Sequence, residues 1–188
     1  VGAQHAATEV WCYDGGVPGP EIRVGQGERL RVVVENRLPE DTTVHWHGIR
    51  LPNAMDGVPH LTQKPIAPGE RFTYEFECPD AGTYWYHPHP HMDTARQVFM
   101  GLAGMFIVND EEEASLNLPS GENEIPLIIQ DKRFAGVSLD YSPTDEEIMT
   151  GYLGEQILVN GIFSPHASVS KGWYRLRLLN GSTARVYD

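Results

Sequence analysis

Residues 28–36 read ERLRVVVEN and residues 71–78 read RFTYEFEC, and both segments alternate apolar with polar side chains. In the first segment Leu30, Val32 and Val34 alternate with positions that are mostly charged. A period of two predicts β-strands with one buried and one solvent-facing side. Turn-forming segments such as DGGVPGP, LPNAMDGVP and APGE lie between such strands, as in an antiparallel sandwich or barrel. The sequence therefore predicts an all-β fold.

Composition bounds the functions that are open to this chain. It has 188 residues, 40% of them hydrophobic, which is enough for a substantial core. Its net charge of −12 argues against a nucleic-acid partner, because nucleic-acid binding depends on clustered Lys and Arg. The longest apolar run, GLAGMFIV at 101–108, is far shorter than the ~20 residues of a membrane span, so none is expected. No segment before residue 110 shows a helical pattern.

The two cysteines, Cys12 and Cys78, do not identify a redox compartment. Their spacing leaves open whether they pair, and two free buried thiols are at least as compatible with it.

The polar stretch NDEEEASLNLPSGENE separates two apolar regions of the chain. It predicts a first domain at residues 1–112, a linker at 113–124 and a second region at 125–188. We expect the second region to be only part of a domain, because it is much shorter than the first.

A weak internal repeat supports this division. Residues 14–36 and 160–180 share a turn, a proline, a glycine seven residues later and an alternating strand that ends in Asn. Each copy is therefore interpreted as the opening of a domain with the same architecture. A half-built sandwich exposes an apolar face, so we expect a further domain of the same polypeptide, or a partner chain, to cover the second region.

Histidines are concentrated in two short segments, TVHWHG at 43–48 and YWYHPHPH at 84–91. On a strand, residues i and i+2 point to the same face, so His45 and His47 are expected to be neighbours, and His87 and His89 likewise. The proline between the second pair cannot donate to a sheet, which places it at a sheet edge or a strand end. Two facing pairs would bring four imidazoles together.

Imidazole is a ligand for copper, zinc, iron and nickel, and a cluster without thiolate or carboxylate favours copper. Alternating pairs suit several ions side by side, whereas a structural zinc site encloses one ion. A single H-x-H pair would be read as chance, but two on predicted strands indicate metal binding. A hydrolytic zinc site is disfavoured, because such sites usually include a carboxylate.

Three segments in order, TVHWHGIRLPNAMDGVP, APGERFTYEFECPDAGTYWYHPHPH and ARQVFMGLAGMFIV, resemble the amino-terminal cupredoxin domain of the multicopper oxidases. The similarity is greatest to the bacterial laccase-like, copper-efflux group. The continuation, from IPLIIQDKRF to SKGWYRLRLLNGSTAR, is similar to the opening of their second cupredoxin domain. The resemblance implies a cupredoxin-like Greek-key β-sandwich followed by the opening strands of a second, incomplete cupredoxin domain.

The resemblance also implies a ligand set. In that family four H-x-H motifs bind a trinuclear copper cluster, and the first two motifs lie in the amino-terminal domain. By motif position, His45 would bind the type 2 copper. His47, His87 and His89 would bind the type 3 pair. The chain would thus supply half of the histidine ligands.

Further roles follow only from the resemblance. Asp56 in the segment MDG would help to deliver protons to the cluster; without the resemblance it is a turn residue before Gly57. His91 continues the alternation, but the family motif uses only the first two histidines, so we expect it beside the cluster or in solvent, with ligation the lesser alternative. The remaining histidines are expected to be isolated surface residues: His5, His60 and His166.

The implied function is that of an oxidase. The whole protein would oxidise phenols, aromatic amines or Cu(I) in one-electron steps and reduce O₂ to water. Its type 1 copper, which needs a cysteine thiolate between histidines, would lie outside this chain, so the chain alone is expected to be inactive. The resemblance suggests a periplasmic or secreted protein. The alternative is a non-catalytic, cupredoxin-like module for copper storage or tolerance.

Overall fold

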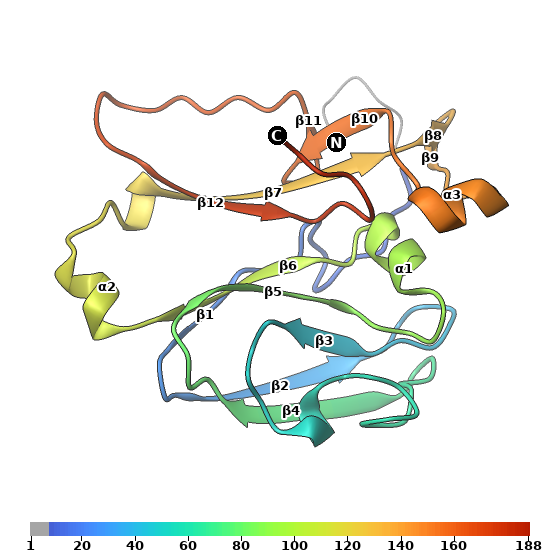
Figure 1. The fold of residues 1–188 in the computed structure, drawn as a ribbon, viewed down its shortest axis with the longest axis horizontal. Helices are drawn as coiled ribbons and strands as arrows, with labels where there is room; N and C mark the ends of the chain where they lie inside the picture. The colour runs from blue at the N-terminus through green and yellow to red at the C-terminus, as the bar shows by residue number, and fades with distance from the viewer. Residues whose placement is uncertain (1–7) are drawn as a thin grey trace.

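The computed structural model describes residues 8–188, and β-strands dominate it (Figure 1). The first sheet has the strand order β1-β6-β5-β3, in which β1 and β6 are parallel and the other neighbours antiparallel. Its strands are β1 (Ile22–Gly25), β6 (Gly104–Asn109), β5 (Gly82–Pro88) and β3 (Val44–His47). An antiparallel pair packs across from it, formed by β2 (Arg29–Glu35) and β4 (Arg71–Glu77).

The β2–β4 pair confirms the predicted alternation. Its register places Leu30 opposite Phe76 and Val32 opposite Tyr74, so these side chains share one face. That face meets Trp46 of β3, which is 1% exposed. The core between the two layers is aromatic and aliphatic; its buried members are Val44, Trp46, Ile66, Tyr74, Phe76, Cys78, Tyr86, Phe106 and Val108. The first region is thus the expected cupredoxin-like β-sandwich.

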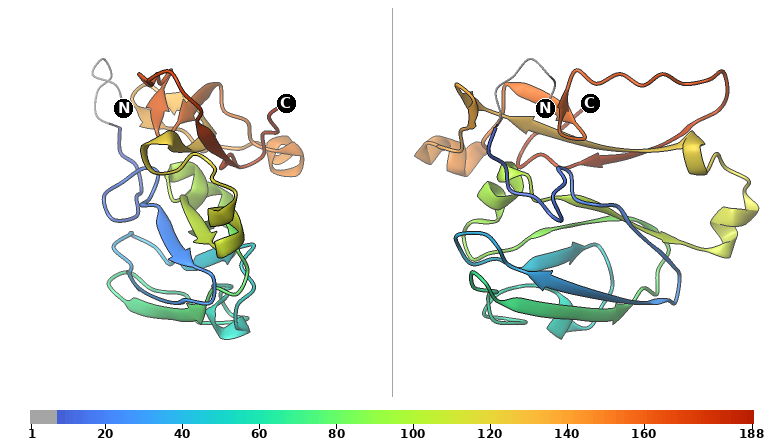
Figure 2. Two further views of the ribbon diagram at one scale, coloured as in Figure 1. Left: turned by 90° about the vertical axis from the view of Figure 1, so that its left-hand side faces the viewer. Right: turned by 180° about the vertical axis from the view of Figure 1, so that it is seen from behind.

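A second four-stranded sheet lies on the outer side of the first, as the stacked layers in Figure 2 show. Its order is β11-β10-β7-β12, with β7 and β12 parallel. Met105 and Ile107 of β6 pack against Ile128 of β7, with Leu179 of β12 beside them. The strands are β7 (Glu124–Lys132), β10 (Gln156–Val159), β11 (Ile162–Phe163) and β12 (Arg175–Asn180), and a small hairpin joins β8 (Phe134–Ala135) to β9 (Ser138–Leu139).

The helices are short, and one of them contradicts the expectation of no helix before residue 110. Helix α1 (Thr94–Met100) lies in that region and buries Gln97, Val98 and Phe99. Seven residues make fewer than two turns, too few for an apolar stripe to repeat along the sequence. The other helical segments are α2 (Glu111–Ser115), α3 (Asp145–Thr150) and the 3₁₀ turns η1 (Asn53–Met55) and η2 (Gly121–Asn123).

The predicted linker at 113–124 is folded over part of its length. It holds the end of α2, the turn η2 and the first residue of β7. The carboxylate of Asp110 accepts a hydrogen bond from the backbone N–H of Glu113 at 2.7 Å and so caps α2. The predicted domain boundaries, 1–112 and 125–188 around this linker, stay a prediction. Within residues 8–188, no helix is both long enough and apolar enough to span a bilayer.

The cysteines are unpaired. Cys78 is buried in the core, and burial, followed by the nearby carboxylates of Glu28 and Glu77, raises the pKa of its thiol to about 11. Cys12 is free but exposed. The alternative of two free buried thiols is therefore correct that both are free, and correct on burial only for Cys78.

Candidate metal centre

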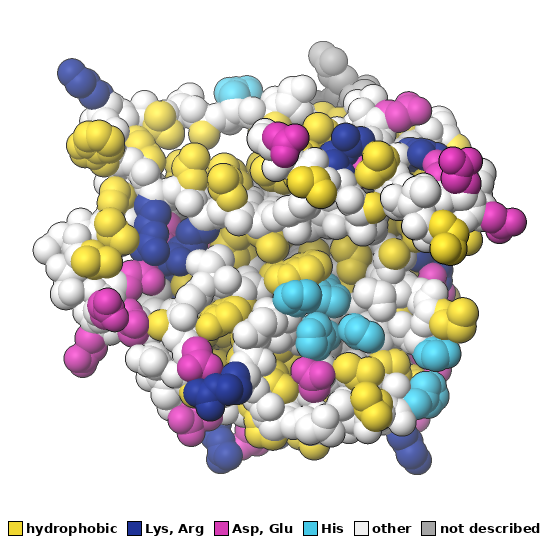
Figure 3. Space-filling model, in the orientation of Figure 1, with side chains coloured by type: hydrophobic (Ala, Val, Ile, Leu, Met, Phe, Trp, Pro, Cys, Tyr) yellow, Lys and Arg dark blue, Asp and Glu magenta, His cyan; other side chains and the backbone are white. Residues whose placement is uncertain are grey.

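The pairing of β3 with β5 brings the two histidine motifs together. The register places His45 opposite His87 and His47 opposite Trp85. Directly paired residues point to the same side of a sheet, so these four side chains share one face. β5 ends at Pro88, which agrees with the prediction of a strand end. Figure 3 shows histidine side chains gathered on one face of the molecule.

Three histidines converge closely enough to share metal ions. His45, His47 and His87 each offer a nitrogen within 4.8 Å of those of the other two. The Nδ1 atom of His47 lies 3.2 Å from Nε2 of His87. The ring centroids are 5.3 Å apart for His45 and His87 and 5.4 Å apart for His47 and His87. This group contains imidazole only, without a carboxylate or thiolate.

His89 lies next to this group, just beyond the end of β5. Its ring centroid is 5.6 Å from that of His45 and 6.3 Å from that of His87. Its Nδ1 atom is buried and has no hydrogen-bond partner among residues 8–188. A buried, unpaired ring nitrogen is costly unless something else binds it, and a metal ion would do so. The residues therefore fit a metal site, and an all-imidazole donor set suits copper.

Backbone carbonyls orient two of the rings. Nδ1 of His45 lies 2.7 Å from the carbonyl oxygen of Asp56, and Nδ1 of His87 lies 2.8 Å from that of Pro88. With the proton on Nδ1 donated to a carbonyl, the lone pair of Nε2 is left free for a metal. The local sequence does not predict these contacts, although the glycine after Asp56 is a signal of a tight turn there.

Asp56 is held beside the cluster by that turn. Its carboxylate oxygen Oδ1 is 3.4 Å from Nδ1 of His45. The turn is attached to β3, because the hydroxyl of Thr43 donates to the carbonyl oxygen of Gly57 at 2.5 Å. Gly57 has φ +80°, and a Cβ there would lie 2.0 Å from the carbonyl oxygen of Val44. Only glycine therefore brings the Asp56 carbonyl so close to β3.

Desolvation favours the neutral form of two of the cluster imidazoles, His87 and His47. It lowers the pKa of His87 to about 4, with the other three ring systems adding to the effect and the bond to Pro88 opposing it. Burial also lowers the pKa of His47, followed by repulsion from His45 and His89. Only a neutral imidazole has a free lone pair for a metal, so these rings are ready to bind metal at neutral pH.

Two tryptophans play different parts. The Trp85 ring lies 4.2 Å from that of His87 and 5.2 Å from that of His47, measured between centroids, and so covers one side of the cluster. Trp46 points to the opposite face and is a core residue.

The remaining histidines are only partly as expected. His91 and His166 are exposed, and His5 lies outside the described residues. His60 is exposed too, but it is not isolated: its ring centroid lies 5.9 Å from that of His91, at an interplanar angle of 86°. The expectation of an isolated His60 was wrong, because the two segments are far apart in sequence and only the fold brings them together.

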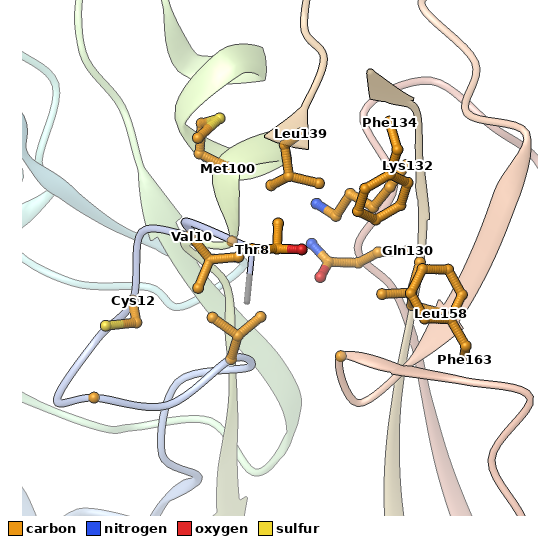
Figure 4. Close-up of a pocket in the computed structure, with 14 residues that line it drawn as sticks. Thr8, Val10, Cys12, Met100, Gln130, Lys132, Phe134, Leu139, Leu158 and Phe163 are labelled. Carbon is orange, nitrogen blue, oxygen red and sulfur yellow. The ribbon is translucent and has the colours of Figure 1, made fainter. Parts of the chain in front are cut away.

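A separate cavity of about 240 Å³ lies between the N-terminal segment and the second sheet (Figure 4). Gln130 and Lys132 of β7 extend toward Thr8 in it, and Leu158 lines its far side. The described histidines do not line it, so this cavity is not the metal centre.

The chain combines a cupredoxin-like sandwich with a cluster of imidazoles on two paired strands. Together the fold and the site are those of a metal-binding β protein. Comparison with known proteins narrows this class. A family model described as "Multicopper oxidase" matches residues 2–113, and the chain belongs to the multicopper oxidase family.

Individual relatives agree with this assignment. The chain is 40% identical to the multicopper oxidase mco of Staphylococcus aureus over 92% of its length. It is 39% identical, over 95% of its length, to the cell division protein FtsP of Escherichia coli strain K12. A solved structure of a bacterial laccase-like multicopper oxidase CueO from Ochrobactrum sp. superimposes with a TM-score of 0.82, at 40% identity over 90% of the chain. The chain spans only 38% of the length of each of these three proteins.

Proposed function

We propose that this chain supplies half of the histidine ligands of a trinuclear copper cluster, in an oxidase that reduces O₂ to water. The electrons would come, one at a time, from a phenolic or aromatic-amine substrate or from Cu(I). The observation that carries the proposal is the convergence of His45, His47 and His87, with the unpaired Nδ1 of His89 beside them. An all-imidazole donor set suits copper, and its spread over two strands suits more than one ion.

The proposed ligand roles follow the motif positions. His45 would bind the type 2 copper, and His47, His87 and His89 would bind the type 3 pair. Bound copper supplies one-electron redox chemistry and dioxygen binding. The chain holds the rings in place: the carbonyls of Asp56 and Pro88 accept from Nδ1 of His45 and His87, and each bond directs Nε2 toward the metal.

Asp56 is the proposed proton donor. Reduction of O₂ consumes protons, and a site covered by an aromatic ring such as Trp85 needs a carboxylate or a water chain to bring them in. The carboxylate of Asp56 lies at one third exposure and 3.4 Å from the His45 ring, so it faces both solvent and the cluster.

The rest of the oxidase is proposed to come from a remaining carboxyl-terminal cupredoxin domain or a partner chain. It would carry the type 1 copper, and this chain alone would be inactive. The outer face of the second sheet supports the idea: Leu176 and Leu178 of β12 are 53% and 63% exposed and stand opposite Ile125 and Leu127 of β7. Such an exposed apolar face is typical of an interaction surface, which supports a further domain or a partner chain on this side. We place the protein in the periplasm or outside the cell by family resemblance.

Oxygen uptake tests the proposal. The whole protein, loaded with copper, is expected to consume O₂ with a phenol or Cu(I) as reductant. His87→Ala should bind fewer copper ions and lose this activity, whereas His166→Ala, at an exposed position between β11 and β12, should leave both unchanged. Copper-loaded protein that consumes no O₂ with either reductant would refute the oxidase.

A non-catalytic copper-binding module is the second candidate. This candidate is supported by the relatives that are named as cell division proteins. Their sequence identity to this chain is about the same as that of the relatives named as oxidases. Full copper binding without any oxygen uptake would support this module and not the oxidase.

A further inference from the structure

His60 and His91 form a second pair of imidazoles on the surface. Their ring centroids are 5.9 Å apart, within the 5.3–6.3 Å between neighbouring rings in the main cluster. Both side chains are exposed, so their ring nitrogens are open to ions from solution. Figure 3 shows a smaller group of histidine atoms beside the larger one.

The segment that carries His60 is held in one conformation. His60 has φ +65°, in the left-handed region, and its N–H donates to the carbonyl oxygen of Gln63 at 2.7 Å. The hydroxyl of Thr62 accepts from the N–H of Val58 at 2.8 Å, and the N–H of Thr62 donates back to the carbonyl oxygen of Val58 at 2.9 Å. These bonds close the turn at 58–63 and fix the backbone under the His60 ring.

The segment that carries His91 is also tied down. The hydroxyl of Thr94 donates to the carbonyl oxygen of Pro90 at 3.2 Å, and helix α1 begins at Thr94. Two segments held by hydrogen bonds thus present two imidazoles with ring centroids 5.9 Å apart, and a prearranged pair loses little entropy on binding.

We propose that His60 and His91 bind one copper ion, as a surface site separate from the cluster. A pair of imidazoles suits divalent copper, which binds nitrogen ligands more tightly than the other first-row divalent metals. The net charge of −12 favours the approach of cations. His91 is two residues from His89, so at most about 7 Å of backbone separates them. The site would hold copper at the edge of the cluster, with water in its remaining coordination positions.

Stoichiometric Cu(II) titration of the chain, followed by electron spin resonance and equilibrium dialysis, tests this site. His60→Asn is the suitable variant, because asparagine tolerates the left-handed backbone and offers no imidazole. His60→Asn and His91→Asn should each lower the affinity for one Cu(II) by roughly 100-fold. Loss of a group that only supports a ligand costs a metal site about 10–100-fold, and loss of a ligand itself should cost no less. His166→Asn is the matched control and should bind as the unchanged chain does.

A separate variant isolates the site from the cluster. His87→Ala should remove cluster copper while the ion at His60 and His91 stays, with a spectrum that shows two nitrogen ligands. This site does not depend on the proposed oxidase activity, so failure of oxygen uptake would leave it standing. Folded His60→Asn and His91→Asn variants that bind as many copper ions as the unchanged chain, with the same affinity, would overturn it.

Discussion

Gly57 illustrates how a single residue fixes the geometry of the cluster. It lets the chain turn directly after Asp56, against the backbone of β3, and the Asp56 carbonyl then orients the His45 ring. The position requires both a positive φ and the absence of a Cβ, and glycine alone meets these two conditions.

We therefore expect Gly57→Ala to destabilise the chain by about 2–5 kcal/mol, from left-handed backbone strain together with overpacking against Val44. It should also weaken copper binding, because the Asp56 carbonyl moves away from His45. Urea unfolding and copper content measure the two effects. Gly27→Ala is the matched control: Gly27 has φ +78° with no atom within 4 Å of the added Cβ, so only the strain of about 1–2 kcal/mol should remain.

Asp56 gives a second prediction at this scale. Asp56→Asn keeps the backbone carbonyl that orients His45, so copper content should be unchanged. It removes the proposed proton donor, so O₂ turnover by the whole protein should fall by roughly 10²–10⁴-fold, the range of general acid catalysis. Asp80→Asn, at an exposed ion pair with Arg50, serves as the control. Full O₂ turnover by the Asp56→Asn variant would refute the proton-donor role and leave Asp56 as a turn residue only.

At the scale of the elements, helix α1 ends against a buried lysine from another layer. Lys132 of β7 is 4% exposed, and its ammonium group donates to the carbonyl oxygens of Val98 and Phe99 in the last turn of α1. Carbonyls at a helix end lack partners within the helix, and Lys132 donates to that of Phe99 and shares that of Val98 with the N–H of Gly101. Burial lowers the pKa of Lys132 to about 7, although Asp131 opposes the shift.

This lysine makes stability depend on pH. Between pH 7 and about 10.5 the unfolded lysine binds a proton that the folded one has lost, so the free energy of unfolding should rise with pH, by at most about 1.4 kcal/mol per pH unit. Lys132→Met should flatten this rise, and Lys171→Met, at an exposed position, should not. Urea unfolding at pH 7, 8 and 9 measures the slopes. Equal slopes for the Lys132→Met variant and the unchanged chain would contradict the assignment.

At the scale of the whole molecule, a buried ionic network joins the two sheets. Arg177 of β12 donates to Glu124 at 2.6 Å, to Glu113 at 2.5 Å and to the hydroxyl of Thr83 in β5 at 2.5 Å. Arg23 of β1 also reaches Glu124, at 2.7 Å. Burial raises the pKa of Glu124, but the hydrogen bonds from Arg177 and Arg23 outweigh it, and the pKa lies below its usual value.

Removal of Arg177 should therefore loosen the second sheet. Arg177→Met leaves the nearly buried side chain of Glu124 and the partly buried one of Glu113 with fewer partners, and we expect a loss of about 3–5 kcal/mol in unfolding free energy. Hydrogen exchange should speed up in β7 and β12. Arg50→Met breaks only the exposed pair with Asp80 and should cost about 0–1 kcal/mol. A similar loss for both variants would mean that the network does not hold the sheets together.

Local pattern alone determined much of this protein. The alternation in 28–36 and 71–78 predicted β2 and β4, because a sandwich strand must bury one side. The H-x-H spacing predicted which rings share a face, because side chains alternate along a strand. These features depend on neighbours in the chain, and they are therefore readable from it.

Tertiary structure decided the rest, because those contacts join residues that are distant in sequence. The register of β3 against β5 sets His45 opposite His87, and the turn at Gly57 brings a carbonyl to His45. The contact of His60 with His91 arises in the same way. No periodicity encodes such pairings, because they follow from how the sheets pack. Helix α1 was not predicted either, because so short a helix is stabilised mainly by its tertiary contacts.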